Sequence, residues 1–383
     1  MSNNLWWFGR QRSVVRDFRT GVSIHSHTNN SRESLEFIER LFETYGLYRH
    51  LMRQGRKKAK QNGMQINLSR AYWTPPMCPR TAFDCEKGQI ENKLELRAMV
   101  SITDHDSIAA PLLLRVVPEA RTIPVSTEWS VPFRASMIHL GIHNLPSARA
   151  QELFDQMSAC TRSRNEEDIC DLLSSLHAIP QVLIVFNHPL WDLYSNPRVI
   201  FEQDLEVFLG KCGGYLHAFE LNGLRRWDEN QRVMKLAARW NQILISGGDR
   251  HGTEPNANVN LTNASSFTEW VEELRVERLS NIMFMPQYDE PLPLRFYQTF
   301  MDAIREYPEH PEGLVRWDQR AYHPDEVGDI KPLGALWENV PPALQMILGL
   351  ATLAEGSLLL NAMRSLRAKP TAKLPDIAGQ EGT

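Results

Sequence analysis

The feature that most constrains this chain is a short apolar run, rich in β-branched residues, that ends in histidine or a carboxylate. The clearest example is the run 243–246, which is followed by two glycines and then by Asp249 and His251. The apolar run predicts a buried strand, and the glycines free the backbone where the strand ends. Asp249 and His251 are two residues apart, so an extended backbone turns both side chains to one side. Taken alone, this segment fits a metal-ligand pair and a capped turn with a surface histidine equally well.

The same pattern occurs five more times upstream. In chain order, the other runs carry His25 and His27, His105 between Asp104 and Asp106, Glu128, His139 and His143, and His188. Burying such groups is costly unless they are paired or bound to a metal, so six unrelated structural origins are hard to accept. Strands alternate with helices at 148–157, 168–177 and 230–240, which favours a parallel sheet with crossover helices. In a closed barrel of that kind the carboxyl ends of the strands hold the site, which is where these residues fall.

The remaining segments have less regular patterns. Residues 1–20 are expected to be a short lead-in whose Trp6, Trp7 and Phe8 pack on the main domain or contact a partner. Helical spacing runs over 34–60 and ends in a basic cluster, which is interpreted as a solvated helix end rather than a phosphate-binding patch. Residues 61–97 are interpreted as an irregular insertion that could cover a site.

Beyond residue 252 the pattern changes. The sequence predicts a loop at 253–266, helices at 267–278 and 294–307, a strand at 282–285, an irregular stretch at 308–340, an apolar helix at 341–367 and a mobile tail at 368–383. The domains expected are therefore 21–255, with the insertion, and a mainly helical extension at 256–367. The apolar helix approaches the length a bilayer requires, but Gln345, Glu355 and Asn361 interrupt it, which favours packing against protein or a second copy of the chain.

Composition excludes few classes. The 383 residues carry a formal net charge of -4, which gives no strong signal for nucleic-acid binding. The five cysteines are scattered without a CxxC pair, which argues against a zinc ribbon or a redox motif and makes the cytoplasm the simplest setting. The first ten residues lack the apolar core of a signal peptide.

Between about Val22 and Gly252 these motifs resemble the PHP superfamily (polymerase and histidinol phosphatase domain) of metal-dependent phosphoesterases. The resemblance rests on six motifs in the family's order: His-x-His-Thr at His25, Ile-Thr-Asp-His-Asp around His105, the strand-end Glu128, Ile-His-Leu-Gly around His139, Asn-His-Pro at His188, and Gly-Asp-Arg-His at Asp249. It implies an α/β fold, a distorted seven-stranded (β/α)7 TIM-like barrel. The seven candidate strands are 22–27, 99–103, 122–127, 136–142, 181–187, 214–221 and 242–248.

The resemblance also implies two or three divalent ions. One would be held by His25, His27, Glu128 and Asp249, a second by Glu128, His139 and His188, and a third by His105, His251 and an aspartate of the opening motif. At that aspartate position this chain has Arg32. Three alternatives stay open: Glu33 substitutes for the aspartate, the third ion is absent, or Arg32 holds substrate phosphate. Mixed imidazole and carboxylate ligands suit Zn, Mn or Fe.

The function expected is hydrolysis of a phosphomonoester or phosphodiester by a metal-bound hydroxide, on a phosphorylated small molecule or a nucleotide. Asp249, His251, Glu128 and Arg250 are the candidate catalytic residues. Arg32, Arg225 and Arg226 are the candidates for substrate phosphate, although each arginine also fits a surface ion pair. Two alternatives are an amidohydrolase-type attack on a C–N or C–O bond and a degenerate domain that only binds a ligand or partner.

Secondary roles near the motifs are left open. Trp129 and Trp191 follow two of the motifs and either pack in the core or stack on a substrate ring. Asp104 and Asp106 either orient ligand rings or, for Asp104, cap a helix. His143 is either an additional polar contact or a surface residue.

Overall fold

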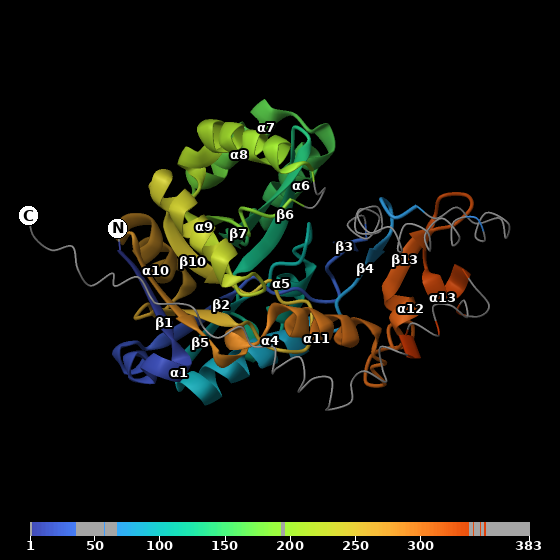
Figure 1. Ribbon diagram of the computed structural model, residues 1–383, viewed down its shortest axis with the longest axis horizontal. Helices are drawn as coiled ribbons and strands as arrows, with labels where there is room; N and C mark the ends of the chain where they lie inside the picture. Colours follow the sequence, from blue (N-terminus) through green and yellow to red (C-terminus); the bar gives the residue numbers. More distant parts are fainter. Residues whose placement is uncertain are drawn as a thin grey trace, which may run out of the picture.

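The computed structural model describes residues 2–35, 57, 67–192, 196–336, 340, 345, 348 and 349. Within these residues the chain forms a larger α/β body and a smaller body at one side (Figure 1). The predicted basic cluster 53–60 and helix 341–367 lie almost entirely outside the described residues, as do most of the helix 34–60 and all of the tail 368–383. In the part of the chain that is described, no helix combines the length and apolarity needed to cross a membrane.

The described strands form three sheets. The first, in spatial order, consists of β1 (Ser2–Trp7), β12 (Leu279–Phe284), β11 (Asn258–Thr262), β2 (Thr20–Ile24) and β5 (Arg97–Ser101). The second consists of β10 (Ile243–Gly247), β9 (Ala218–Asn222), β8 (Leu183–Phe186), β7 (Ser136–Leu145) and β6 (Val125–Phe133). The third, smaller sheet consists of β14 (Ile330–Pro332), β13 (Ala321–Pro324), β4 (Tyr72–Trp73) and β3 (Glu33–Ser34).

Helices cover the outer faces of the two larger sheets (Figure 1). They are α1 (Phe8–Gln11), α4 (Pro79–Gln89), α5 (Ala109–Leu114), α6 (Ala150–Ser163), α7 (Glu166–His177), α8 (Arg198–Cys212), α9 (Trp227–Arg239) and α10 (Phe267–Glu272). α11 (Leu292–Ile304) instead contacts the loops after β9 and β10, where Arg295 donates to Gly223 O and Asp302 accepts from Thr253 N–H. α12 (Trp317–Arg320) and α13 (Leu333–Leu336) lie beside the small sheet. Short helices of other types are η1 (Arg12–Asp17), η2 (Ile90–Leu94), η3 (Pro118–Ala120), η4 (Gly213–Tyr215), η5 (Glu273–Glu277) and η6 (Pro286–Asp289).

All seven predicted strands are present, but the closed barrel is not confirmed. Ladder hydrogen bonds divide the seven strands between two sheets, and neither sheet closes on itself within the described residues. The sheets nevertheless meet along two edges, just beyond the ends of the ladders. On one edge, Asp249 N–H donates to His25 O at 2.8 Å, and Ser26 bridges to Arg250. On the other, Asp106 N–H donates to the carbonyl of Glu128 at 2.9 Å.

The expectation of an all-parallel sheet is wrong at β7. This strand runs antiparallel to both β6 and β8, because a tight connection at residues 134–135 replaces a crossover helix between β6 and β7. β8, β9 and β10 are parallel, as predicted. A reversed strand carries its amino-terminal half, rather than its carboxyl end, to the edge where its neighbours end.

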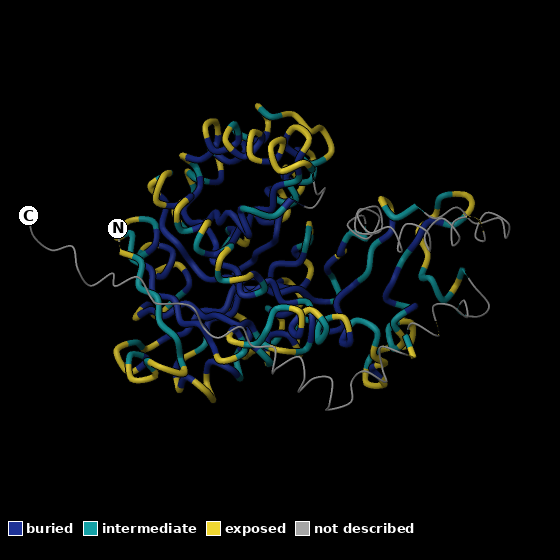
Figure 2. The backbone as a smooth tube through the Cα atoms, viewed as in Figure 1, coloured by how far each residue is buried: buried dark blue, intermediate teal, exposed yellow. Residues whose placement is uncertain are grey.

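The core lies between the strands and their helices, and the buried backbone runs through the middle of the larger body (Figure 2). Every residue of β2, β8, β9 and β10 is buried. Strands covered on both faces read as continuous apolar runs, which explains why 243–246 was recognisable from sequence. α9 shows the complementary pattern, with Val233, Leu236 and Ala237 buried at helical spacing.

The predicted loop at 253–266 is wrong in its centre, where the chain forms β11. The two asparagines of β11 are buried and bond to neighbouring strands. Asn258 Nδ2 donates to Leu221 O at 2.8 Å, and Asn260 Nδ2 donates to Ser246 O at 3.1 Å. β11, which follows the boundary expected at residue 255, pairs antiparallel with β2, which precedes that boundary.

Segments expected to be irregular also carry structure. α4 and η2 lie in the expected insertion, and β13, β14, α12 and α13 lie within 308–340. The two segments join each other, because β13 pairs with β4 and the ring of Tyr322 stacks on Tyr72 at 4.7 Å. α8 had no sequence prediction. The lead-in also proves structured, since β1 pairs in parallel with β12 and Trp7 stacks on Phe284.

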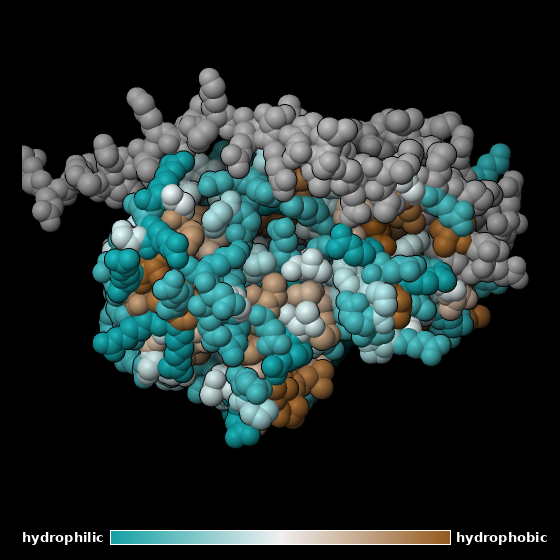
Figure 3. All heavy atoms as spheres, turned by 90° about the horizontal axis from the view of Figure 1, so that it is seen from below, coloured by the Kyte–Doolittle hydropathy of each residue, from teal (hydrophilic) through white to brown (hydrophobic). Residues whose placement is uncertain are grey.

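Two features of the outer layer complete the fold. Cys170 of α7 and Cys212 of α8 form a disulfide, with Cα atoms 5.5 Å apart, that the sequence spacing did not indicate. The surface face in Figure 3 is mainly hydrophilic, with small separate apolar patches. The most exposed large apolar side chains lie on different elements, among them Val116, Val276 and Val327. Scattered apolar residues of this kind are normal on soluble surfaces.

Candidate metal centre

Glu128, in β6, lies at the centre of the predicted cluster and is fully buried. Its Oε2 is 2.9 Å from His25 Nε2 and 3.3 Å from His27 Nε2. Its Oε1 is 3.1 Å from His188 Nε2 and accepts a hydrogen bond from Asn187 Nδ2 at 3.0 Å. Because each carboxylate oxygen faces its own imidazoles, Glu128 is placed to bridge two ions.

Three of the cluster residues have backbone angles in the left-handed region. The φ angles are 65° at His25, 29° at His188 and 56° at Asp249. Such positions cost on the order of 1–3 kcal/mol each and persist where surrounding contacts impose them. Here the Asp249 N–H is held by His25 O, and the His188 N–H by Glu220 Oε2 at 2.8 Å. The chain turns sharply at each strand end, which brings these three side chains into one group of possible ligands.

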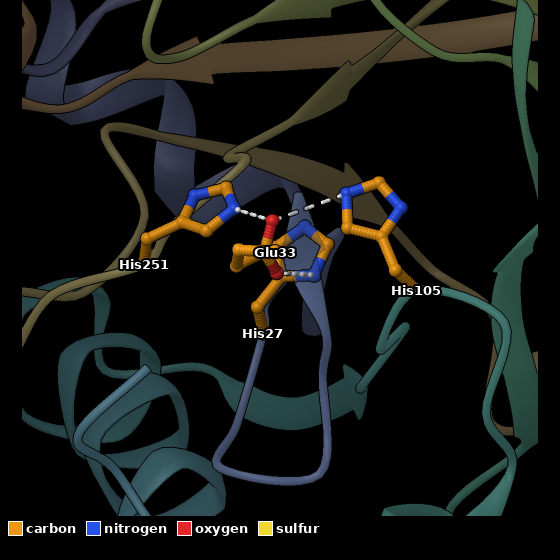
Figure 4. Close-up of side chains that lie close together, drawn as sticks. All are labelled: His27, Glu33, His105 and His251. Atoms are coloured by element: carbon orange, nitrogen blue, oxygen red, sulfur yellow. Dashed lines mark ion pairs between the residues drawn. The ribbon is translucent and has the colours of Figure 1, made fainter. Parts of the chain in front are cut away.

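Glu33 directly follows Arg32, the residue at which this chain departs from the expected motif. Figure 4 shows its carboxylate between three imidazoles. Glu33 Oε2 is 3.0 Å from His251 Nε2 and 3.4 Å from His105 Nε2, and its Oε1 is 3.5 Å from His27 Nδ1. β3 carries Glu33 to this position, because β3 pairs with β4 at Trp73. Of the alternatives left open at Arg32, the geometry favours substitution by Glu33.

His139 joins the cluster from the reversed strand. It lies in the first half of β7, opposite Ser130 of β6, and therefore faces the same edge as the ends of the neighbouring strands. His139, His105 and Glu128 form a further group of possible ligands. His143, four residues on, is buried deeper and hydrogen-bonds Ser101 Oγ through Nδ1 at 2.9 Å, so the surface interpretation of His143 is wrong.

The electrostatics keep the carboxylates ready to bind cations. Burial alone would raise the pKa of Glu128, but the nearby His105 and His25 hold it well below its usual range. Asp249 behaves in the same way, with His25 lowering its pKa against the effect of burial. Burial lowers the pKa of His139 well below the usual value, which leaves that imidazole neutral. Ionised carboxylate and neutral imidazole are the forms that bind metals.

Two imidazoles carry protons that a metal would displace. Burial opposes protonation of His27, but the neighbouring carboxylates, Glu33 first, raise its pKa to about 10. The pKa of His25 is likewise raised well above its usual value by Glu128, Glu220 and Asp249, against the effect of burial. Binding a cation in place of these protons relieves the same concentration of negative charge, so metal binding should release protons.

Glu220 supports the cluster from behind and was missed in the sequence. It is fully buried in β9, with Oε1 2.5 Å from His25 Nδ1 and Oε2 accepting from Asn222 Nδ2 at 2.9 Å. A carboxylate on the second ring nitrogen fixes the orientation of a ligating imidazole. The available signal was an acid inside an apolar strand, two residues before the polar tip. Gly247 leaves the space for it, since a Cβ there would lie 1.7 Å from Glu220 Oε1.

The four candidate arginines divide into two pairs. Arg225 lies beside the cluster, with NH2 3.5 Å from Asp249 Oδ2 and its guanidinium carbon 4.6 Å from the Trp191 ring centre. Arg250 is buried behind the cluster, where Nε donates to Glu86 Oε1 at 2.9 Å. Arg226 is exposed and pairs with Asp228, and Arg32 is exposed over the Tyr72 ring. The structure therefore brings Arg225 to the cluster and leaves Arg226 and Arg32 outside it.

The structure decides between the alternative roles left open for Trp129 and for Asp104. Trp129 is 1% exposed and donates from Nε1 to Thr161 Oγ1 at 2.8 Å, so it packs in the core. Asp104 accepts hydrogen bonds from Thr28 N and Oγ1, so it holds the loop after His27 rather than capping a helix. Trp191 lies at the cluster, with its ring centre 5.3 Å from that of His188.

The residues present fit divalent metals. Four groups of side chains each bring possible ligand atoms within 4.8 Å of one another, and together they contain all eight predicted ligands and Glu33. The donors are imidazole nitrogens and carboxylate oxygens, as Zn, Mn or Fe prefer. His27 Nε2 is buried and has no hydrogen-bond partner within the described residues, although it faces two carboxylates. A buried nitrogen in that position is the arrangement expected of a metal ligand.

Comparisons with known proteins do not assign the chain to a family. No family model matches the chain, and no curated protein matches its sequence. An amidohydrolase from Chromobacterium violaceum, solved with sulfate and no metal, is 13% identical with a TM-score of 0.34, over 60% of this chain and 87% of that one. A Bifidobacterium adolescentis protein assigned as a metal-dependent phosphoesterase is 15% identical with a TM-score of 0.36, over 67% of this chain and 97% of that one. At such scores neither likeness carries an argument about fold or function.

Proposed function

We propose that the chain is a metal-dependent phosphoesterase of the PHP type, which hydrolyses a phosphomonoester or phosphodiester with two or three Mn, Zn or Fe ions. The observation that carries the proposal is the convergence of nine histidine and carboxylate side chains into four overlapping groups of ligands. They come from positions spread between His25 and His251, and several are fully buried. A structural role does not require so many imidazoles and carboxylates at one point, since each buried charge would cost stability without a cation.

Divalent ions held by these residues would lower the pKa of a bound water and neutralise charge on the phosphoryl group. The chain's own contribution is to place both partners of the reaction. Glu128 and Asp249 both contact Nε2 of His25, and Glu220 orients the same ring through Nδ1. Arg225 stands beside Asp249, and its buried Nε makes no hydrogen bond in the described part of the chain but lies 3.8 Å from Glu229 Oε1. We assign Arg225 to a non-bridging phosphate oxygen, because a guanidinium matches phosphate in a two-pronged geometry.

The substrate class is a phosphorylated small molecule or a nucleotide. Trp191 supports this, because its ring stacks under Arg225 and stands next to His139 and His188 at the cluster. Trp73 stands at another side, 6.1 Å from the ring of His251. Aromatic side chains beside a phosphate-binding group suit a substrate with a flat or apolar moiety next to its phosphate.

Metal analysis together with turnover tests the proposed function. Purified protein should contain two or three transition-metal ions per chain, and it should hydrolyse p-nitrophenyl phosphate or bis-p-nitrophenyl phosphate. Chelation should abolish turnover, and added Mn²⁺ or Zn²⁺ should restore it. Turnover of amide or lactone substrates with none of phosphate esters would instead favour the amidohydrolase alternative. Protein without metal and without metal-stimulated turnover would support the binding-module alternative.

A matched pair of arginine variants tests the assignment of Arg225. Arg225→Gln should lower kcat/KM for a phosphate ester by about 10–100-fold, the loss of one charged hydrogen bond to substrate. Arg226→Gln should leave kcat/KM within about twofold, because its exposed ion pair with Asp228 contributes little. Metal content should be measured for both variants, since Arg225 also touches Asp249. Equal losses in the two variants would contradict the assignment.

A further inference from the structure

A small cavity lies between α11 and the loops that follow β9 and β10. Its wall includes Gly223 after β9, residues of the loop 248–257 after β10, and Arg295 and Gln298 of α11. His251 belongs both to this wall and to the metal centre, so the cavity adjoins the proposed reaction site. The cavity has a volume of about 40 Å³. One water requires about 10–15 Å³ and a whole small molecule about 300 Å³ or more, so this space suits a single functional group of a larger ligand.

Arg295 is a buried cation in the wall of this cavity. It is 7% exposed and forms no ion pair within the described residues, where Glu290 and Glu254 act on it only through their longer-range charge. Burial lowers the pKa of Arg295, although those charges act in the opposite direction. A buried charge costs stability unless an opposite charge lies beside it, so the position of Arg295 favours an anion in the cavity.

One edge of the Arg295 guanidinium is open to such an anion. NH1 donates to Gly223 O, and the guanidinium carbon lies 5.0 Å from the ring centre of Tyr288. Nε and NH2 make no hydrogen bond within the described residues, and Nε is buried. These two nitrogens form the edge that binds both oxygens of a carboxylate or two oxygens of a phosphate.

Two carboxylates also line the cavity, but neither is placed to neutralise Arg295. Asp302 Oδ2 accepts from Thr253 N–H at 2.7 Å and from Thr253 Oγ1 at 2.9 Å, and its Oδ1 lies 3.5 Å from Arg305 NH1. Asp302 therefore holds the loop after β10. Glu254 is exposed and forms no ion pair with Arg295 in the described part of the chain.

Three more buried atoms of the wall lack a hydrogen-bond partner among the described residues. They are the donor Arg250 NH2 and the acceptors Gln298 Oε1 and Asn256 Oδ1. Most buried polar atoms in native proteins are paired with protein, water or ligand. Waters alone would satisfy these three atoms, but they would leave the charge of Arg295 without a counterion.

We propose that this cavity is a substrate subsite, which binds a second anionic group, a phosphate or a carboxylate, of a molecule whose scissile phosphate lies at the metal centre. The proposal rests on the function proposed above. The open edge of Arg295 binds two oxygens of the second group, and Gln298 Oε1 accepts from a hydroxyl or protonated oxygen next to it. Both residues belong to α11, so the segment beyond the metal-binding motifs selects the substrate.

Binding of probes that cannot be hydrolysed tests the subsite apart from catalysis. Protein loaded with Mn²⁺ and freed of excess metal is titrated calorimetrically with alkyl phosphonates of increasing chain length that end in a phosphonate, a carboxylate or a hydroxyl group. At the best chain length, an anionic end should strengthen binding about tenfold or more over the hydroxyl end, and the stronger anion identifies the group preferred. Equal affinities for the three ends at every length, or no binding of any probe, overturn the proposal.

The same titrations separate the subsite from the proposed function. Phosphonates are not turned over, so a protein that prefers an anionic end but hydrolyses no phosphate ester would contradict the function alone. A protein that hydrolyses phosphate esters but binds all three ends equally would contradict the subsite alone.

Three variants on α11 locate the subsite, and each is judged by the ratio of the two affinities, which cancels any general loss from weaker packing. Arg295→Gln should reduce the advantage of the anionic end to within about twofold, whereas Arg295→Lys, which keeps the charge but not the two-nitrogen edge, should retain part of it. Gln298→Glu has nearly the same shape and should remove the advantage through repulsion of like charges. An unchanged advantage in Arg295→Gln and Gln298→Glu, or equal losses in the two Arg295 variants, overturns the assignment.

Discussion

Replacement of Glu128 by glutamine is expected to lower metal content and turnover more than any other single change in the cluster. Glu128 takes part in two of the four groups of ligands and is within 4 Å of five imidazoles. Glutamine has nearly the same shape but no charge, and only one of its two end atoms can bind a cation. Loss of a residue that only orients a ligand costs about 10–100-fold in metal affinity or activity. Loss of a bridging ligand should exceed the upper end of that range.

The measurement is metal content by mass spectrometry, together with kcat for a chromogenic phosphate ester at saturating Mn²⁺. Asp106→Asn is the matched control. Asp106 flanks the same cluster, but its Oδ1 accepts from the main-chain N–H of Ser130 at 2.9 Å, and an asparagine oxygen can accept the same hydrogen bond. The control should retain metal and turnover within about twofold, since a surface substitution of this kind is nearly neutral. Wild-type metal content and turnover in Glu128→Gln would show that the cluster does not hold ions in the proposed way.

The residues predicted from sequence are those with a local signal. Asp249, His188 and His25 each follow an apolar run, and the fully buried strands behind them are recognisable because both of their faces are apolar. The convergence of these strand ends follows from pairing between neighbours, which the alternation of strands and helices indicated. Glu220 also lies in such a strand, but an isolated acid in an apolar run gives no indication of which imidazole it orients.

What could not be predicted depends on contacts between distant segments. Whether β7 returns as a hairpin or through a crossover depends on how β6 and β7 pack, and the two residues at the turn do not decide it. The asparagines of β11 have the composition of a loop, and only their bonds to carbonyls of β2, β9 and β10 make a strand favourable. The small sheet joins β3 and β4 to β13, about 250 residues later in the chain, so no local pattern specified it.

Glu33 depends on that small sheet, and a pair of adjacent variants tests whether Glu33 or Arg32 acts at the site. Glu33→Gln should remove about one ion per chain, because the His27, His105 and His251 group has no other carboxylate within its own set. Turnover should fall by about 100-fold or more if that ion takes part in catalysis, by comparison with losses at residues that only support a ligand. Arg32→Gln should change neither metal content nor kcat by more than about twofold, since Arg32 is exposed over Tyr72 and a cation–π contact at an exposed site contributes little.

The two measurements separate the three explanations for the departure at Arg32. Loss of an ion in Glu33→Gln alone would mean that Glu33, one position after Arg32, is the acidic ligand and that the small sheet holds it in place. A raised KM in Arg32→Gln, with metal content unchanged, would mean that Arg32 binds substrate phosphate instead. Wild-type metal content and turnover in both variants would mean that only two ions are required. The first result is expected, because Glu33 is the residue whose carboxylate lies 3.0 Å from His251 Nε2, while Arg32, directly before β3, lies over the Tyr72 ring.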